Sequence, residues 1–260
     1  MGISAKINYC YTWMGVMKKT GSELDLMVFA AHPDDAELCC GGTIAAITAM
    51  GKRVAIIDLT RGELGTRGTV ATRQNEARRA SGILGVKVRE NLKIPDGNII
   101  NSPANRLKII KMLRLYRPGV VFLPHYIDRH PDHARTHELV KESVFYSGLS
   151  KIRTAGLEPY RPARSFFYMQ SSVFEPNVIL DISSYFEIKM NAVKCYSTQF
   201  HTGNSKQKKK EPETFISNPG FMEYIEARSR FYGFQIGVKY GEAFYTEEKL
   251  KLKPELIFDI

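Results

Sequence analysis

Three short runs of almost uninterrupted apolar residues stand out along the chain. They occupy residues 24–31, 54–59 and 120–123. A run of this length without polar alternation is typical of a parallel strand that helices cover on both faces. The pattern therefore predicts three buried strands at the centre of a sheet.

Segments with apolar residues at helical spacing separate and follow these runs. The predicted helices span residues 41–50, 73–84, 102–116, 133–146, 183–196 and 223–232. In the first of them, Thr43 is the predicted cap and Gly51 the stop. Weaker strands are predicted at 91–94, 165–168 and 178–180, and a Gly-rich polar loop at 60–72.

The alternation of strands and helices continues over about 150 residues, which predicts an α/β protein: a Rossmann-like three-layer sandwich with a mostly parallel sheet. We expect one domain over residues 24–246, preceded by an N-terminal extension at 1–23 and followed by a C-terminal tail at 247–260. The Lys-rich segment at 206–210 is predicted to be a surface loop. In such sheets ligands bind at the carboxyl ends of the strands.

Composition narrows the class of protein. The 260 residues are 43% hydrophobic and 25% charged, which is typical of an ordinary globular protein and excludes collagen-like, coiled-coil and mostly disordered chains. No run approaches the roughly 18 apolar residues of a membrane span. The formal net charge of +10 indicates an anionic partner: nucleic acid, a membrane surface or a small acidic substrate. The four cysteines form no C-x-x-C pair, which favours free thiols in a reducing compartment, the cytoplasm.

Two histidine–aspartate motifs follow predicted strands. One reads A-H-P-D-D-A-E at residues 31–37, and the other R-H-P-D-H at 129–133. Each alone is compatible with a turn that caps a helix. Because neighbouring parallel strands end at the same edge of a sheet, the two motifs are predicted to meet there.

Zinc binds imidazole and carboxylate ligands, and a catalytic zinc site needs three protein ligands and one open position. The best set here is His32, Asp35 and His133. A pair of His133 with His137 one helical turn further on is an alternative, but it lacks the adjacent Glu of an H-E-x-x-H motif.

Three further residues of the two motifs have predicted catalytic roles. Asp34 is left beside the metal, where it is expected to act as general base toward water. His130, as an imidazolium, is expected to stabilise an oxyanion and protonate the leaving amine. Asp132 is expected to hold the ring of His130 or His133 in the required tautomer.

The basic residues allow more than one interpretation. Most of those at 61–89 and 106–117 are typical of solvated helix faces, and the stretches lack the interleaved aromatics of a nucleic-acid surface. Arg61, Arg73 and Arg129 adjoin strand-end loops, where an arginine can recognise a carboxylate or hydroxyl groups. A nucleic-acid-binding Rossmann domain without catalytic activity remains the alternative outside the enzymes.

The motifs together resemble the LmbE-like zinc-dependent N-acetylglucosaminyl deacetylases. Beyond the two histidine motifs, the similarity rests on L-T-R-G-E-L-G-T-R-G-T at 59–69, R-x-x-E-x-x-x-A at 73–80, Y-S-T-Q-F at 196–200 and I-E-A-R-S-R-F-Y-G at 225–233. The subgroup that it resembles most is the bacillithiol-biosynthesis type. The resemblance implies hydrolysis of the acetamide of N-acetylglucosaminyl malate, with deacetylation of chitobiose-type sugars or cleavage of thiol conjugates as alternatives.

The resemblance also implies roles for individual residues. It gives the same metal ligands, base and oxyanion residue as the spacing does, with Zn²⁺ as the metal and Fe²⁺ as an alternative. Arg73 and Asp96 match positions that contact sugar hydroxyls, and Arg129 matches a contact to the malate carboxylate. Arg61 and Glu63, in the 59–69 motif, are assigned to substrate binding with them. The expected partner is a small, anionic N-acetylated amino-sugar conjugate, not nucleic acid or membrane, and the expected assembly is a homo-oligomer, a hexamer in related proteins.

Overall fold

The computed structural model describes residues 23–200 and 212–251. Within them, a seven-stranded sheet has the order β3-β2-β1-β4-β5-β7-β6. The strands are β1 (Leu26–Ala30), β2 (Val54–Asp58), β3 (Val88–Asn91), β4 (Val120–Pro124), β5 (Arg164–Tyr168), β6 (Val178–Asp181) and β7 (Gly241–Tyr245). The strands β1 to β5 are parallel, whereas β7 runs antiparallel to both of its neighbours.

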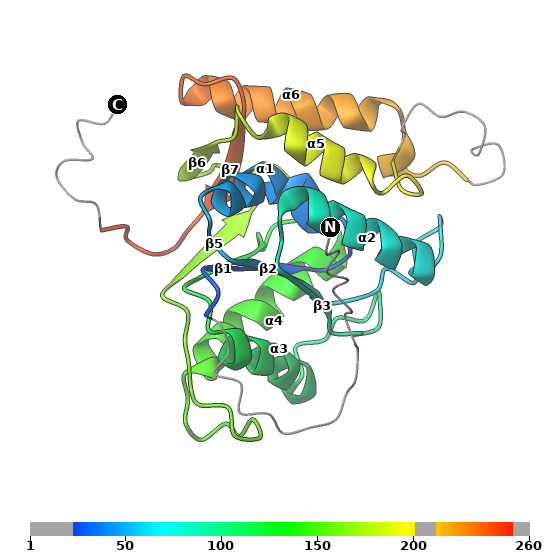
Figure 1. The fold of residues 1–260 in the computed structure, drawn as a ribbon. Coiled ribbons are helices and arrows are strands. Elements are labelled where there is room, and N and C mark those ends of the chain that lie inside the picture. The colour runs from blue at the N-terminus through cyan, green and yellow to red at the C-terminus, as the bar shows by residue number, and fades with distance from the viewer. Residues whose placement is uncertain (1–22, 201–211, 252–260) are drawn as a thin grey trace, which may run out of the picture.

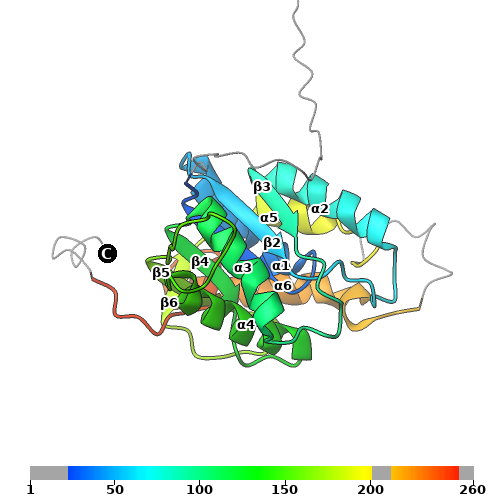
Figure 2. The same ribbon diagram turned by 90° about the horizontal axis from the view of Figure 1, so that it is seen from below.

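Helices cover both faces of the sheet (Figures 1 and 2). One face carries α1 (Asp35–Ala49), α2 (Val70–Leu84), α5 (Phe186–Lys194) and α6 (Gly220–Gln235), and the other carries α3 (Pro103–Tyr116) and α4 (Pro131–Ser147). Alternate residues of β1 supply the two cores: Val28 packs in one, and Met27 and Phe29 in the other. The predicted three-layer α/β sandwich is confirmed. The predictions for the extension up to residue 22, the 206–210 loop and the tail beyond residue 251 lie outside the described residues.

The first helix begins earlier than the sequence pattern predicts. It starts at Asp35 rather than residue 41, so Thr43 lies inside α1 and does not cap its start. The helix is kinked at Cys40, whose φ of −138° is not helical. The two glycines that follow lie in the helix because α5 and the residues before it pass so close: a Cβ on Gly42 would stand 2.8 Å from Ile182.

The kink gives the second half of α1 an N-terminus of its own, with backbone N–H groups that have no helical partner. The Glu242 carboxylate accepts hydrogen bonds from the N–H groups of Gly42 at 3.0 Å and Thr43 at 2.7 Å. It also pairs with the buried Lys189 ammonium at 2.6 Å. The anion at this Gly-rich segment is therefore a side chain of the protein itself.

Other boundaries differ by smaller amounts. The third strand lies at Val88–Asn91 instead of residues 91–94, and β7 was not predicted, since G-E-A-F-Y is short and has a charge at its second position. Both α2 and α4 begin slightly earlier than predicted, at Val70 and Pro131. No helix among the described residues is long and apolar enough to cross a membrane.

Candidate metal centre and active site

The two histidine–aspartate motifs meet at the carboxyl edge of the sheet, as predicted. The first forms the turn from β1 into α1, and the second begins α4 after β4, the strand next to β1. His130 is the N-cap of α4 and Pro131 its first residue, a position that suits proline because its missing N–H would have no partner there.

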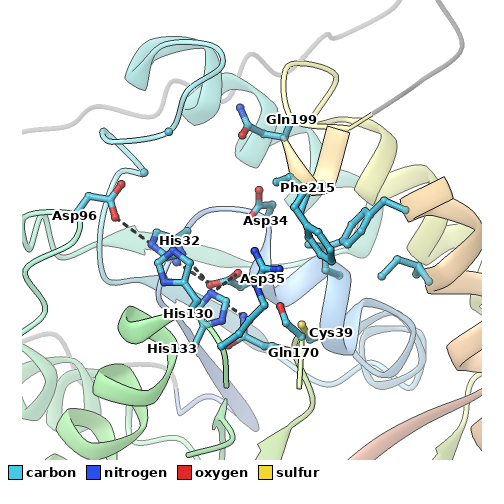
Figure 3. A pocket seen from close by; sticks show the side chains of 18 of the residues that line it. His32, Asp34, Asp35, Cys39, Asp96, His130, His133, Gln170, Gln199 and Phe215 are labelled. Atoms are coloured by element: carbon cyan, nitrogen blue, oxygen red, sulfur yellow. Dashed lines mark hydrogen bonds and ion pairs between the residues drawn. The ribbon is translucent and has the colours of Figure 1, made fainter. Parts of the chain in front are cut away.

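His32, Asp35 and His133 bring one ligand atom each to within 4.8 Å of one another. The Asp35 carboxylate lies between the two rings, 3.4 Å from His133 Nε2 and 3.5 Å from His32 Nδ1. All three line the cavity shown in Figure 3. The sequence-predicted metal ligands are therefore neighbours in space.

A carboxylate holds the outward nitrogen of each ring. His133 Nδ1 lies 2.8 Å from Asp128 Oδ1, and His32 Nε2 lies 3.0 Å from Asp96 Oδ1. The second oxygen of Asp128 accepts the backbone N–H groups of Ser171 and Ser172, so this carboxylate is fixed in turn. Metal-binding histidines in proteins are oriented by such outer carboxylates.

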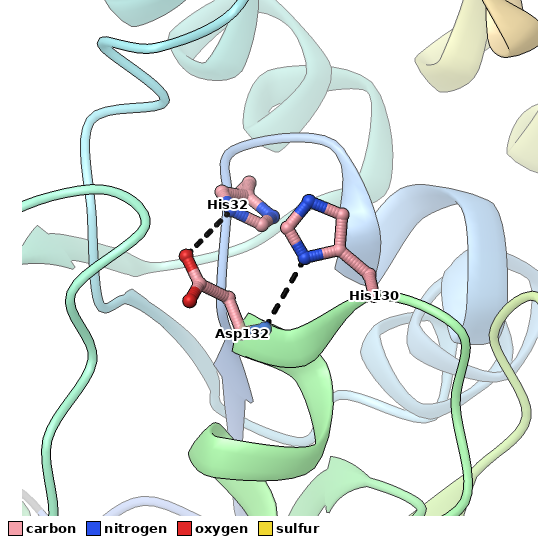
Figure 4. Close-up of side chains that lie close together, drawn as sticks. All are labelled: His32, His130 and Asp132. Atoms are coloured by element: carbon pink, nitrogen blue, oxygen red, sulfur yellow. Dashed lines mark hydrogen bonds and ion pairs between the residues drawn. The ribbon is translucent and has the colours of Figure 1, made fainter.

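A second group of potential ligands comprises His32, His130 and Asp132 (Figure 4). It needs His32 Nε2, because that nitrogen faces the Asp132 carboxylate at 3.5 Å. The same nitrogen is engaged by Asp96 at 3.0 Å and, as a ring N–H, donates to it. One ring cannot offer both nitrogens while one carries a proton, so the first group is the better metal site.

The first group fits a divalent metal ion by the chemistry of its donors. Two imidazoles and one carboxylate, each ring backed by a carboxylate, are ligands that zinc accepts in catalytic sites. Although burial opposes it, the charge of Asp35 and the hydrogen bond to Asp128 raise the pKa of His133 to about 9. Burial acts to raise the pKa of Asp35, but the two histidines outweigh this effect and hold the pKa well below its usual range.

Asp34 lies beside this group in a different environment. Its backbone has φ 118°, in the left-handed region that a non-glycine residue seldom adopts. Burial raises the pKa of its carboxyl group to about 7, against the opposing charge of Arg73. Arg73 Nη2 donates to Asp34 Oδ2 at 3.0 Å and to the carbonyl of Pro33. A buried carboxylate with such a pKa is suited to receive a proton near neutral pH.

Arg73, assigned to substrate binding from the sequence, lines the cavity and is buried. Its contact there is the ion pair with Asp34. Its guanidinium therefore neighbours the predicted base as well as the space for a substrate.

Asp132 acts on the His130 ring through its backbone N–H and not through its carboxylate. Its carboxylate contacts neither the His130 nor the His133 ring; it accepts the Gly97 N–H at 2.8 Å and faces His32. Only its backbone N–H reaches His130, donating to Nδ1 at 3.2 Å. As the second residue of α4, Asp132 points across to the loop that carries Gly97.

The surroundings of the His130 ring favour its neutral form, whereas the sequence analysis predicts an imidazolium. Burial lowers its pKa, and the neighbouring His133 and His32 lower it further. Because Nδ1 accepts the Asp132 N–H, the neutral ring carries its proton on Nε2. His130 therefore offers a neutral N–H donor in place of the expected imidazolium.

Two of the predicted substrate residues do not line the cavity. Arg61 is exposed beside Glu63, and the Glu63 carboxylate accepts the backbone N–H groups of Asp96 and Arg61. Both therefore support the loop that holds Asp96. The carboxylate of Asp96 faces His32 and the Leu64 N–H, and although burial opposes it, the contact with His32 lowers its pKa to about 2.

Arg129 lines the cavity, with its guanidinium carbon 4.1 Å from the centre of the Phe215 ring. The cavity has a volume of about 290 Å³, near the lower end of the range for small-molecule sites. Sequence reasoning missed one wall of it, formed by Phe215, Phe221 and Tyr224 near the start of α6. Their identification needed the fold, because this segment is distant in sequence from both motifs.

His137 is a core residue, not a ligand. Its Nδ1 lies 2.8 Å from the Pro124 carbonyl and its ring packs edge-on against Phe167. Burial lowers its pKa to about 4. The alternative pair with His133 is therefore excluded by geometry.

Comparison with known proteins identifies the class of protein to which this fold and this site belong. The sequence profile of the GlcNAc-PI de-N-acetylases (PIG-L) matches residues 27–144. The diacetylchitobiose deacetylase of Thermococcus kodakarensis is 34% identical over 226 residues, which cover 81% of this chain and 78% of that protein. The chain belongs to this family of deacetylases.

Two further relatives are similar over most of their length. A probable N-acetyl-alpha-D-glucosaminyl L-malate deacetylase of Bacillus anthracis is 29% identical, covering 70% of this chain and 84% of that protein. The crystal structure of a conserved protein from Thermus thermophilus superposes with a TM-score of 0.80 at 40% identity, covering 89% of this chain and 98% of that one. These similarities support a deacetylase of N-acetylglucosamine-type substrates.

Proposed function

We propose that this protein is a metal-dependent hydrolase that removes the N-acetyl group of an N-acetylglucosaminyl conjugate. The observation that carries the proposal is the convergence of His32, Asp35 and His133 in one cavity with the Asp34 carboxylate and the His130 ring. Zinc is the proposed metal, with ferrous iron as the alternative. When bound, such an ion lowers the pKa of a water molecule and polarises the acetamide carbonyl.

The side chains of the protein divide the proton transfers and the stabilisation of charge. Asp34 Oδ accepts a proton from the attacking water, and the same carboxyl group then donates it to the nitrogen of the leaving amine. His130 donates a hydrogen bond from Nε2 to the oxygen that becomes negative. Arg73 keeps Asp34 in place through its ion pair and its hydrogen bond to Pro33.

For the substrate we propose N-acetylglucosaminyl malate, and with it a place in bacillithiol biosynthesis. Arg129 supports this choice: it stands at the cavity, and among the described residues no acidic side chain pairs with it. A guanidinium in that position can bind a carboxylate through two parallel hydrogen bonds.

A second candidate is N,N'-diacetylchitobiose, an uncharged sugar. It is favoured by the aromatic wall of Phe215, Phe221 and Tyr224, since aromatic rings pack against apolar faces of a ligand. The 34% identical relative named above deacetylates this class of compound according to its name.

Release of acetate from both compounds by zinc-loaded protein tests the proposal and separates the two candidates. We expect Arg129→Ala to lower kcat/KM for the malate conjugate by about 10- to 100-fold, because the loss of a charged hydrogen bond costs about 1.5–3 kcal/mol. Turnover of diacetylchitobiose should change little. The exposed Arg153, which does not line the cavity, supplies the control variant Arg153→Ala. An equal effect of Arg129→Ala on both substrates would refute the malate assignment.

A further inference from the structure

Gln199, in the Y-S-T-Q-F segment, is a buried side chain at the cavity to which neither the proposed mechanism nor the metal site assigns a role. It is 5% exposed and lines the same cavity as Asp34 (Figure 3). Arg73 lines this cavity too. Its side-chain nitrogen donates to the carbonyl of Arg67 at 2.7 Å and to Thr198 Oγ1 at 3.0 Å.

These two partners fix which way the amide faces. A backbone carbonyl oxygen can only accept a hydrogen bond, so the amide atom beside the Arg67 carbonyl must be the NH₂ group. The oxygen Oε1 is then turned the other way. Among the described residues, no hydrogen bond is donated to this oxygen.

We propose that Gln199 is a substrate-binding residue whose Oε1 accepts a hydrogen bond from the sugar beside its acetamide group. An N-acetylglucosaminyl unit offers two such donors, the acetamide N–H and the neighbouring 3-hydroxyl. A fixed acceptor at a small cavity recognises a donor without ordering a flexible side chain at the moment of binding. This inference rests on the proposed deacetylase function and adds a specificity contact to it.

Glu76 is the positioning residue for this contact. It stands one helical turn after Arg73 on the buried face of α2. Its carboxylate accepts three hydrogen bonds from the segment before Gln199: from Thr198 N at 2.9 Å, Thr198 Oγ1 at 2.8 Å and Ser197 Oγ at 3.3 Å. The R-x-x-E spacing thus serves both sides of the cavity, since Arg73 holds Asp34 and Glu76 holds the Gln199 segment.

The variant Gln199→Leu tests the contact in the metal-loaded full chain, with N,N'-diacetylchitobiose as substrate. We expect kcat/KM to fall about 10- to 100-fold, because the substrate donor is then buried without a partner. The matched control is Gln74→Leu, at an exposed position of α2, which should leave kcat/KM unchanged. If both variants fold and have the same kcat/KM as the unmodified protein, the proposal is wrong.

A substrate that lacks the 3-hydroxyl identifies the donor. If Gln199 binds that hydroxyl, Gln199→Leu should lose kcat/KM on the normal substrate but not on the 3-deoxy analogue. If it binds the acetamide N–H, the loss should be the same on both. Gln199→Leu without any loss on either compound contradicts the proposal.

A double-variant cycle separates positioning by Glu76 from a merely structural role. Glu76→Ala should lower kcat/KM in the unmodified background but hardly further in the Gln199→Leu background, since it acts through Gln199. Glu76→Gln, which keeps an acceptor oxygen for Thr198 N, should restore most of the activity. Additive losses would show that Glu76 only stabilises the fold.

Binding without turnover keeps the inference testable if the proposed function fails. The dissociation constant of diacetylchitobiose, measured by calorimetry on metal-loaded Asp34→Asn protein, should rise about tenfold or more on adding Gln199→Leu. Binding that weakens in this way without any acetate release from the unmodified protein would refute the hydrolase and keep the Gln199 contact. Equal dissociation constants, or no binding to either protein, would refute the contact.

Discussion

At the scale of single residues, Asp34 and Asp35 are adjacent in sequence but have opposite electrostatic surroundings. Asp34 is buried beside one arginine, and its pKa is raised to about 7. The pKa of Asp35, between two histidines, is held well below its usual range. Environments that separate the pKa values of neighbouring carboxyl groups are a common means of assigning them different tasks.

Replacement of Asp34 by asparagine tests this division. Asp34→Asn should retain the metal, because Asp35 supplies the carboxylate ligand, but lower kcat by about 10²- to 10⁴-fold through loss of the base. Metal content by mass spectrometry and the rate of acetate release are the two measurements. Loss of the metal with Asp34→Asn would mean that the two aspartates exchange roles.

The affinity for the metal should depend steeply on pH. In the metal-free protein, His133 has a pKa of about 9 and the pKa of His32 is raised well above its usual value, so both rings are protonated at neutral pH. A metal ion must displace these protons. Between pH 8 and pH 6 we expect the apparent dissociation constant to rise by about 10- to 100-fold per pH unit, measured by competition with a chelator of known pH dependence. A constant affinity over this range would argue against these rings as ligands.

The sequence was sufficient to predict that His32, Asp35 and His133 lie together, because they belong to two turns at the ends of neighbouring strands. It did not reveal Asp128, which lies one residue before the quoted R-H-P-D-H motif and meets His133 only because the loop folds back onto Ser171 and Ser172. The sequence favours Asp132 for orienting the His130 or His133 ring, because Asp132 lies between these two histidines in sequence. Contacts made by loops have no periodic pattern from which to predict them.

At the scale of elements, the kinked α1 depends on a residue from the far end of the sheet. Glu242 in β7 caps its second half and pairs with Lys189 of α5, and both charged groups are almost completely buried. The sequence pattern predicts a helix start at the glycines, because two adjacent glycines are unusual inside a helix and indicate a break there. The break is real, but it is a kink inside a longer helix whose cap comes from a strand that was not predicted.

Glu242→Gln should therefore destabilise the protein strongly. It leaves the Lys189 ammonium buried without its counter-charge, and breaking a buried pair in this way typically costs about 3–5 kcal/mol. The free energy of unfolding in urea is the measurement. The double variant Lys189→Met, Glu242→Gln removes both charges and should recover part of the loss; a Glu242→Gln protein as stable as the parent would contradict this account.

At the scale of the whole molecule, the fold was predictable because β1, β2 and β4 are continuous apolar runs, which only a sheet covered on both faces can bury. The order of the strands and the antiparallel direction of β7 were not predictable from the sequence, since they depend on contacts between distant segments. The structure also shows that some of the basic residues behind the net charge of +10 have partners inside the protein. Arg73, Arg89 and Arg114 are engaged inside the fold. Arg129 lines the cavity, and among the described residues no acidic side chain pairs with it.

The stability of the molecule toward acid should depend in part on His137. Burial lowers its pKa to about 4 in the folded protein, against about 6.5 in an unfolded chain. Between these values the unfolded state binds more protons, so the free energy of unfolding should fall as the pH falls, by at most about 1.4 kcal/mol per pH unit from this group.

Urea unfolding of the parent protein and His137→Gln at pH 7.5, 6.5 and 5.5 measures this contribution. The glutamine can still donate to the Pro124 carbonyl but does not titrate in this range. The difference in stability between the two proteins should shift in favour of His137→Gln as the pH falls. A difference that is independent of pH would show that His137 does not resist protonation.

The cap on α1 also sets an order of events during synthesis. Gly42 and Glu242 are 200 residues apart in the chain, and at about 5–20 residues per second a ribosome needs roughly 10–40 s to cover that distance. Once residue 133 has been added, the nascent chain carries both histidine–aspartate turns. It still lacks the carboxylate of Glu242, which completes the helix that follows the first turn. The competence of the site is thereby tied to the arrival of one of the last strands to be translated.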